Sequence, residues 1–360
     1  MAHIAIFLMP ERGHVLPALG MIAELVRRGH RVSCPVPAPF AEAVTECGAT
    51  AIPCGTTLPA ELPESLFEAA QLALVEAEST LPLLEAVFRQ DLPDIVLWDI
   101  AAWAGGVIAR RTGAPSLLLE SLLTSNSHWS LGAAVVPART FDLEAIRFFT
   151  RVQEFVGCAL PEFVAGTRRR IALFAREFQP EGDTFDERFA FTGPCLTERA
   201  FQGTWTPPND TPVVLATIDA QTCADAAHGM PWHLVAKGKV SNPSPNVEAH
   251  DDVPQLKVLE HASVFITHGG LGGVMEALHH GVPMIVVPRM TDQRLNGQRV
   301  EELGLGVLLD SVTEESVRSL VGQLMSDSAI SARVKDMQRM IHRAGGSTFA
   351  ADVVEEELAR

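Results

Sequence analysis

Short apolar runs alternate with longer amphipathic stretches in the first 120 residues of this chain. The apolar runs lie at 3–9, 31–36, 49–54, 93–98 and 115–120. The stretches between them have helical spacing, at about 15–28, 40–47, 64–90 and 101–112. Apolar runs of this length are typical of parallel strands that are buried on both faces. The alternation therefore predicts a doubly wound α/β domain.

The pattern is less regular between residues 121 and 170, where one helix is expected at about 141–157. Two further strands are expected at 170–175 and 189–194. In open α/β sheets, irregular excursions after a strand commonly line a substrate pocket. We expect this region to contribute to such a pocket.

A polar, proline-containing segment at 197–212 has the composition of a linker. The alternation of strands and helices restarts after it. Strands are expected at 213–217, 232–236, 263–267, 283–287 and 306–309, with helices between them and further helices at about 313–325, 328–343 and 347–359. The sequence thus predicts two Rossmann-like halves that face each other across a cleft.

Composition and charge narrow the class of protein. The chain has 360 residues, of which 47% are hydrophobic and 20% charged, and its formal net charge is −16. An acidic chain is a poor partner for nucleic acid or anionic membrane, so we expect small-molecule ligands. No apolar run reaches the roughly 18 residues of a membrane span, and no signal peptide begins the chain, so a cytoplasmic protein is expected. Its six cysteines are scattered without a CxxC pair, which favours reduced thiols over zinc ligands or disulfides.

His14 lies just after the first predicted strand, at the start of a helix. Open sheets place reactive groups at this position, where a neutral histidine can act as a general base. A capping or core histidine is the alternative. The turn contains only Gly13, whereas a dinucleotide fingerprint needs three glycines, which disfavours a nicotinamide-dependent reductase.

Asp99 follows the apolar run IVLW and is also expected at the carboxyl edge of the sheet. A carboxylate there could accept a hydrogen bond from Nδ1 of His14 and stabilise the imidazolium that forms on proton uptake. Capping of the helix at 101–112 is the alternative, because Asp is a favoured N-cap residue.

A glycine-rich turn follows His268 at the mouth of another predicted helix. Its four glycines are Gly269, Gly270, Gly272 and Gly273. Exposed backbone N–H groups at the positive end of a helix favour an anion, so the turn is a candidate phosphate site. Glu276 lies one turn into the same helix.

Asp292 and Gln293 follow the predicted strand at 283–287. An acid and an amide side by side suit hydrogen bonds to sugar hydroxyls. Capping of the helix at 293–303 is the alternative.

Taken together, these segments resemble the GT-B glycosyltransferases of the UDP-glycosyltransferase superfamily, and most closely the bacterial macrolide-type branch. The resemblance covers nearly the whole chain. It is carried by GHVLPAL, PDIVLWD, FQPEGDTFDERFAFTGP, DVPQLKVL, FITHGG, MEAL, GVPMIVVP, DQ and RVEELGLG.

The resemblance implies a direct displacement at the anomeric carbon of a nucleotide-linked sugar, with inversion and without a metal. His14 would deprotonate the acceptor hydroxyl, and Asp99 would orient His14. The acceptor would be an apolar natural product of macrolide, polyketide or flavonoid type, as in antibiotic biosynthesis. It would bind near 63–85 and 121–160, within an N-terminal domain spanning 1–200.

For the donor, the resemblance implies a UDP- or TDP-linked sugar bound by a C-terminal domain at 201–346. The diphosphate would contact Thr217 and His268 with the turn Gly270, Gly272 and Gly273. Glu276 would bind the ribose, Val253 and Gln255 the nucleobase, and Asp292 and Gln293 the sugar. Residues 347–360 would form a helix crossing back to the N-terminal domain, in a monomer or homodimer.

Four residues depart from the family pattern in the donor half. Gly272 and Gly273 replace hydroxyl or amide side chains, and Asp219 and Asp252 introduce carboxylates. At about 4 Å and an effective dielectric of about 20, a carboxylate and a phosphate repel by roughly 4 kcal/mol. The alternative hypothesis is therefore a repurposed GT-B protein. It would perform non-glycosyl acid–base chemistry on a natural product, or assist the biosynthesis of one.

Overall fold

The computed structural model describes residues 1–135 and 143–360, and the chain divides into two compact units. Unit 1 comprises Met1–Thr197 together with Ala344–Arg360, and unit 2 comprises Glu198–Arg343. The divisions expected from the sequence were at 200 and 346. In the structure the chain leaves unit 1 after Thr197 and returns to it at Ala344.

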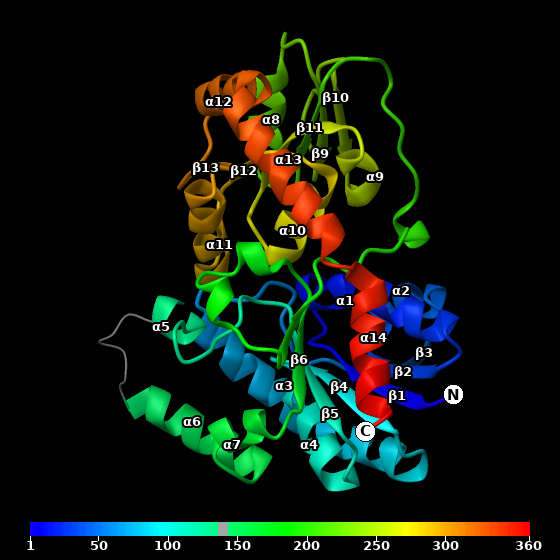
Figure 1. The fold of residues 1–360 in the computed structure, drawn as a ribbon. Helices are drawn as coiled ribbons and strands as arrows, with labels where there is room; N and C mark the ends of the chain where they lie inside the picture. The colour runs from blue at the N-terminus through cyan, green and yellow to red at the C-terminus, as the bar shows by residue number, and fades with distance from the viewer. Residues whose placement is uncertain (136–142) are drawn as a thin grey trace. The chain divides into compact units, whose positions relative to one another are not determined.

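The described residues of unit 1 form a parallel sheet of seven strands (Figure 1). In spatial order these are β3 (Thr50–Pro53), β2 (Arg31–Val36), β1 (His3–Phe7), β4 (Ile95–Asp99), β5 (Ser116–Glu120), β6 (Arg169–Ala172) and β7 (Phe189–Phe191). The order reverses between β1 and β4. In doubly wound sheets the carboxyl ends of the two strands at such a reversal flank the ligand crevice.

Helices cover both faces of this sheet. They are α1 (Arg12–Arg27), α2 (Ala38–Glu46), α3 (Leu66–Gln90), α4 (Trp103–Thr112), α5 (Leu131–Val135), α6 (Leu143–Val156), α7 (Leu160–Ala165) and α14 (Gly346–Leu358), with 3₁₀ turns η1 (Arg176–Phe178) and η2 (Gly182–Thr184). One core cluster joins Phe7 and Trp98 of the sheet to Phe88 of α3 and Val152 of α6. Side chains alternate along β1, so Ile4 and Ile6 face the opposite side.

Helix α14 lies beside α1, although the two helices come from opposite ends of the chain (Figure 1). Arg28 donates to Asp352 at 2.7 Å and to Glu355 at 2.6 Å. Gly20 of α1 donates its N–H to the carbonyl of Cys195 at 3.2 Å. A Cβ at Gly20 would lie 2.4 Å from that oxygen, so only glycine permits this approach.

Unit 2 contains, in its described residues, a parallel sheet of six strands. Its spatial order is β10 (Val247–His250), β9 (His233–Lys237), β8 (Val213–Ala216), β11 (Ala262–Thr267), β12 (Met284–Val286) and β13 (Gly306–Leu308). The helical segments are η3 (Ala200–Gln202), α8 (Ala220–Ala227), α9 (Gln255–Leu259), α10 (Leu271–His280), α11 (Thr291–Glu302), α12 (Glu314–Ser326) and α13 (Ser328–Arg343).

Two parallel-sheet α/β units confirm the predicted fold class. Strand β10 was not predicted, because its sequence VEAH has no apolar run and it lies at the edge of the sheet. The helix expected at 141–157 corresponds to α6, and its first two positions, together with 136–140, lie outside the described residues.

Candidate functional site

His14 and Asp99 meet at the carboxyl edge of the unit 1 sheet. Strands β1 and β4 are parallel neighbours with Phe7 opposite Trp98, so the segments that follow them emerge side by side. His14 lies in the first turn of α1, and Asp99 is the last residue of β4. The His14 Nδ1 is 2.9 Å from both carboxylate oxygens of Asp99. The side chains are 12% and 1% exposed, respectively, so the pair is largely shielded from water.

Neither residue caps a helix. The N-cap of α1 is Glu11, whose carboxylate accepts the N–H of Gly13. The N-cap of α4 is Ala102, and no side chain caps it. The capping alternatives for His14 and Asp99 therefore do not describe this structure.

Ser121 is a third member of this group, and sequence reasoning missed it. Its hydroxyl donates to Asp99 Oδ2 at 2.6 Å and lies 2.7 Å from His14 Nδ1. The backbone N–H of Ala101 donates to Asp99 Oδ1 at 2.9 Å. These contacts fix the carboxylate and favour the tautomer in which His14 Nδ1 carries the proton. The opposite nitrogen, Nε2, is then the atom that can accept a proton.

A second buried carboxyl group, Glu120, directly precedes Ser121. Burial raises its pKa, and the nearby Arg170 and the hydroxyl of Thr124 oppose that rise. The Thr124 hydroxyl donates to Glu120 at 2.8 Å, and Arg170 donates to it at 3.2 Å. These bonds anchor the chain on both sides of Ser121.

The glycine turn of unit 2 links β11 to α10. Gly269 has φ +82°, and a Cβ there would lie 2.5 Å from Cγ1 of Val286, so glycine is required. Asn296 of α11 donates its side-chain amide to the Gly269 carbonyl at 2.9 Å. Asn296 is buried and was not predicted as a site residue. The turn is thus held in place from the neighbouring helix.

The start of α10 is built from backbone. Its N-cap is Gly270, which provides no side-chain cap, and the His268 ring lies against Gly270. A Cβ at Gly273 would meet no heavy atom closer than 3.7 Å, so this position has room for a side chain. The first N–H groups of α10, which precede the helical hydrogen-bond ladder, can bind an anion.

Glu276 is held in a buried ion pair. Its Oε1 is 2.7 Å from Nη2 of Arg199, and their side chains are 5% and 1% exposed. Gln255 donates to Glu276 Oε2 at 2.6 Å. Arg199 has φ +48° in the segment expected to be a polar linker, and sequence reasoning missed it. The predicted ribose and nucleobase residues Glu276 and Gln255 are therefore joined, and the side chain of Val253 is buried.

Asp292 and Gln293 lie in the first turn of α11, and both are largely buried. Gln293 Oε1 accepts the backbone N–H groups of Arg289 at 2.9 Å and Met290 at 3.1 Å. The capping alternative therefore describes the oxygen of Gln293, which leaves the amide nitrogen as the donor that a sugar could use.

The two acidic departures are each paired with a base within unit 2. Asp219 is 3.2 Å from Nη2 of Arg289, and Asp252 is 3.1 Å from Nζ of Lys237. A compensating positive charge thus accompanies each carboxylate.

The Thr217 N–H donates to the carbonyl of Ile266 at 3.0 Å, which sets the end of β8 beside the end of β11.

Among residues 1–135 and 143–360, no three His, Cys, Asp or Glu side chains gather in a way that could hold a metal ion. None of the described helices combines the length and the apolar character needed to cross a membrane.

Comparisons with known proteins agree with this architecture. A family model described as the erythromycin biosynthesis protein CIII-like C-terminal domain matches residues 215–354. The NDP-glycosyltransferase YjiC of Bacillus licheniformis is 36% identical, covering 99% of this chain and 98% of that protein. The demethyllactenocin mycarosyltransferase of Streptomyces fradiae is 33% identical, covering 100% of this chain and 87% of that protein. A solved structure described as the glycotransferase of kitacinnamycin superposes with a TM-score of 0.85 at 35% identity, covering 99% of both chains.

Proposed function

Because this chain belongs to the bacterial macrolide-type glycosyltransferases of the GT-B fold, we propose that His14 is the base of an inverting, metal-independent sugar transfer. The donor is a UDP- or TDP-linked sugar, and the acceptor is a hydroxyl of an apolar natural product. The observation that carries the proposal is the shielded contact of His14 with Asp99 at 2.9 Å.

In the proposed reaction, Nε2 of His14 takes the proton of the acceptor hydroxyl as its oxygen attacks the anomeric carbon. The bond from that carbon to the diphosphate oxygen breaks, and its electron pair leaves with the nucleoside diphosphate. Asp99 stabilises the imidazolium through Nδ1–H, and Ser121 holds Asp99 in place. A positioned base of this kind contributes about 10²–10⁴-fold to the rate.

We assign donor binding to unit 2. The N-terminus of α10, with His268, Gly270, Gly272 and Gly273, would receive the diphosphate together with Thr217, because helix N-termini stabilise developing negative charge. Glu276 would accept hydroxyl groups of the ribose. Asp292 and the amide nitrogen of Gln293 would contact the sugar, and Val253 and Gln255 the base.

The repurposed alternative rested on Asp219, Asp252, Gly272 and Gly273. Of these, the two carboxylates lie beside basic groups within unit 2, Arg289 and Lys237. Glycine at positions 272 and 273 provides no side chain to bind phosphate, which lowers the expected phosphate affinity. The backbone N–H donors of Gly272 and Gly273 remain.

The test combines binding and turnover. Calorimetric titration with UDP, TDP and their glucose conjugates should detect micromolar binding of at least one of them. With a trihydroxyflavone as the acceptor probe, His14→Ala should lower the rate of nucleoside diphosphate release about 10²–10⁴-fold and leave nucleotide affinity unchanged. The exposed His228 provides the control, since His228→Ala should retain both properties.

Two results would contradict the proposal. One is no binding of any of these nucleotides at millimolar concentration by folded protein. The other is full turnover by His14→Ala, which would remove the base from its assigned role.

A further inference from the structure

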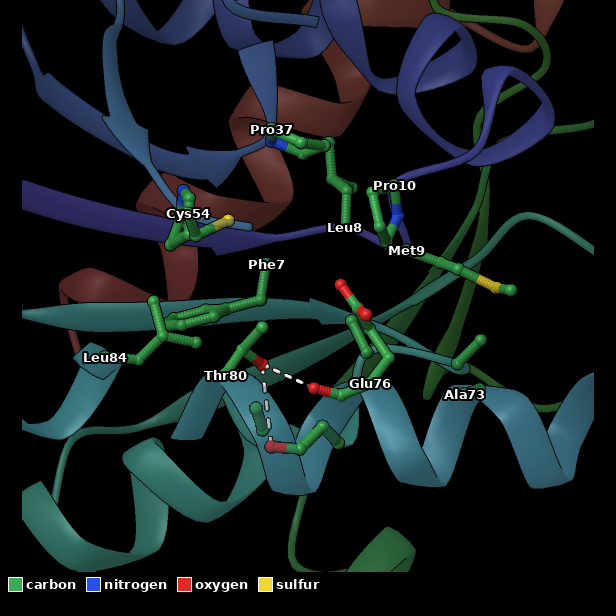
Figure 2. A pocket seen from close by; sticks show the side chains of 15 residues that line it. Phe7, Leu8, Met9, Pro10, Pro37, Cys54, Ala73, Glu76, Thr80 and Leu84 are labelled. Atoms are coloured by element: carbon green, nitrogen blue, oxygen red, sulfur yellow. Dashed lines mark hydrogen bonds between the residues drawn. The ribbon is translucent and has the colours of Figure 1, made fainter. Parts of the chain in front are cut away.

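A small cavity of about 40 Å³ lies in unit 1, bounded by loops that follow β1, β2 and β3 and by helix α3 (Figure 2). Its walls are mainly apolar. Met9 and Pro10 line it directly before α1, which carries His14. Ala101 and Ala102 line it directly after Asp99. The cavity is therefore bounded by the same two loops that hold the proposed base and its carboxylate.

Glu76 brings a charge into these apolar walls. Figure 2 shows its carboxylate extending from α3 into the pocket. The residue is 7% exposed and belongs to the buried face of α3. Its Oε2 accepts the N–H of Thr57 at 2.5 Å and the hydroxyl of Thr57 at 2.7 Å. Two neutral donors on one oxygen hold the carboxylate in place without cancelling its charge.

The residues lining the cavity supply no positive charge. All of them lie in the described part of the chain, and none is Lys, Arg or His. The hydroxyl of Thr80 donates to the backbone carbonyl of Glu76 at 2.8 Å. Burial, and secondarily the charge of Glu76, raise the pKa of the Cys54 thiol to about 11, so this wall is neutral near pH 7.

A carboxylate in such surroundings is stabilised most by a cation, because a neutral donor leaves its charge uncompensated in a medium of low dielectric. The cavity has room for a few water-sized groups and is too small for a whole natural product. What it can receive is one substituent of a larger molecule whose hydroxyl reaches His14.

We propose that Glu76 selects acceptors bearing a protonated amine, which enters this cavity and pairs with the carboxylate. The inference rests on the proposed function, because it concerns the acceptor of that reaction. The net charge of −16 adds a general attraction for cationic molecules.

The test compares two probes of nearly the same shape, 6-(aminomethyl)-2-naphthol and 6-(hydroxymethyl)-2-naphthol. Calorimetry at pH 7 measures the ratio of their affinities, which needs no turnover. The wild-type chain should bind the amine about tenfold more tightly or better, as expected for a charge-assisted contact. In Glu76→Gln this ratio should fall close to one.

Glu68 provides the matched control, since it is an exposed glutamate in the first turn of the same helix. Glu68→Gln removes an equal charge, and its ratio should equal that of the wild type. If Glu76→Gln does not fold, the wild-type ratio measured at high salt decides, because salt screens the general attraction of the acidic chain and screens a buried contact much less. Equal affinities for the two probes, or no measurable binding of the amine, would overturn the inference.

Transfer is measured separately on the same probes with UDP-glucose and TDP-glucose. If sugar is transferred to both probes and the chain binds both with equal affinity, the role of Glu76 is contradicted and the proposed function is retained. A clear preference for the amine without transfer from either donor would support the role of Glu76 as a cation site and contradict the proposed function.

Discussion

The candidate sites at the carboxyl edges of the two sheets are built from different chemical groups. In unit 1 the proposed chemistry rests on side chains, with His14, Asp99 and Ser121 within hydrogen-bonding distance of one another. In unit 2 the proposed phosphate site is made of backbone, in a glycine turn where a Cβ at Gly269 would lie 2.5 Å from Val286 and one at Gly270 would lie 2.8 Å from the His268 ring. Both sites lie after central parallel strands.

The difference determines how each site responds to mutation. A side-chain group loses its function when one atom is removed. A backbone turn tolerates substitution wherever space exists. It is held by Asn296, which donates to the Gly269 carbonyl, and the helix that it opens carries Glu276 of the buried Arg199–Glu276 pair. Three substitutions test this contrast.

The largest effect is expected for Arg199→Met. It leaves Glu276 buried without its ion-pair partner, which should lower the free energy of unfolding by about 3–5 kcal/mol. Arg199→Met combined with Glu276→Gln should recover most of that loss, because replacing both partners removes the uncompensated charge. Urea denaturation of the full chain measures both variants. A loss below about 1 kcal/mol for the single variant would show that the pair is not structural.

An intermediate effect is expected for Ser121→Ala. Loss of its hydrogen bond to Asp99 should lower kcat about tenfold and leave the KM for the nucleotide sugar unchanged. Ser121→Thr keeps the hydroxyl and should retain most of the wild-type kcat. Steady-state kinetics with the flavone probe supplies the measurement, and equal rates for the alanine and threonine variants would count against a positioning role.

The smallest effect, and a gain, is expected for Gly273→Ser. The position has room for a Cβ, so the new hydroxyl can reach a bound diphosphate and tighten TDP binding about three- to tenfold. Gly273→Ala adds the same Cβ without the hydroxyl and separates this effect from helix stabilisation. Equal TDP affinities for the two variants in calorimetry would mean that the diphosphate does not lie at this turn.

The strands could be predicted where they are buried on both faces, because uninterrupted apolar runs have few alternatives. The edge strand β10 could not, since its exposed position accepts polar residues. His14 and Asp99 could be predicted from their places after two strands. Their 2.9 Å contact could not, because it depends on β1 and β4 being neighbours in space.

The missed residues have no local signal. Ser121 is one of several serines in an irregular segment, and only the pairing of β4 with β5 brings it to Asp99. Arg199 lies in a polar segment, which predicts that its side chain is exposed to solvent. Its partner Glu276 is on a helix far along the chain. Glu76 follows the helical spacing of α3 without any sign that it faces a cavity.

The return of α14 to α1 has a consequence for the order in which the units are completed during synthesis. Unit 2 is a continuous segment, Glu198–Arg343, and all of it is made before α14 is available. Unit 1 is begun before unit 2, but its α1 is not covered until α14 has been synthesised. At about 5–20 residues per second, that interval lasts roughly ten to thirty seconds. During it the part of α1 that α14 contacts, Arg28 included, stays uncovered.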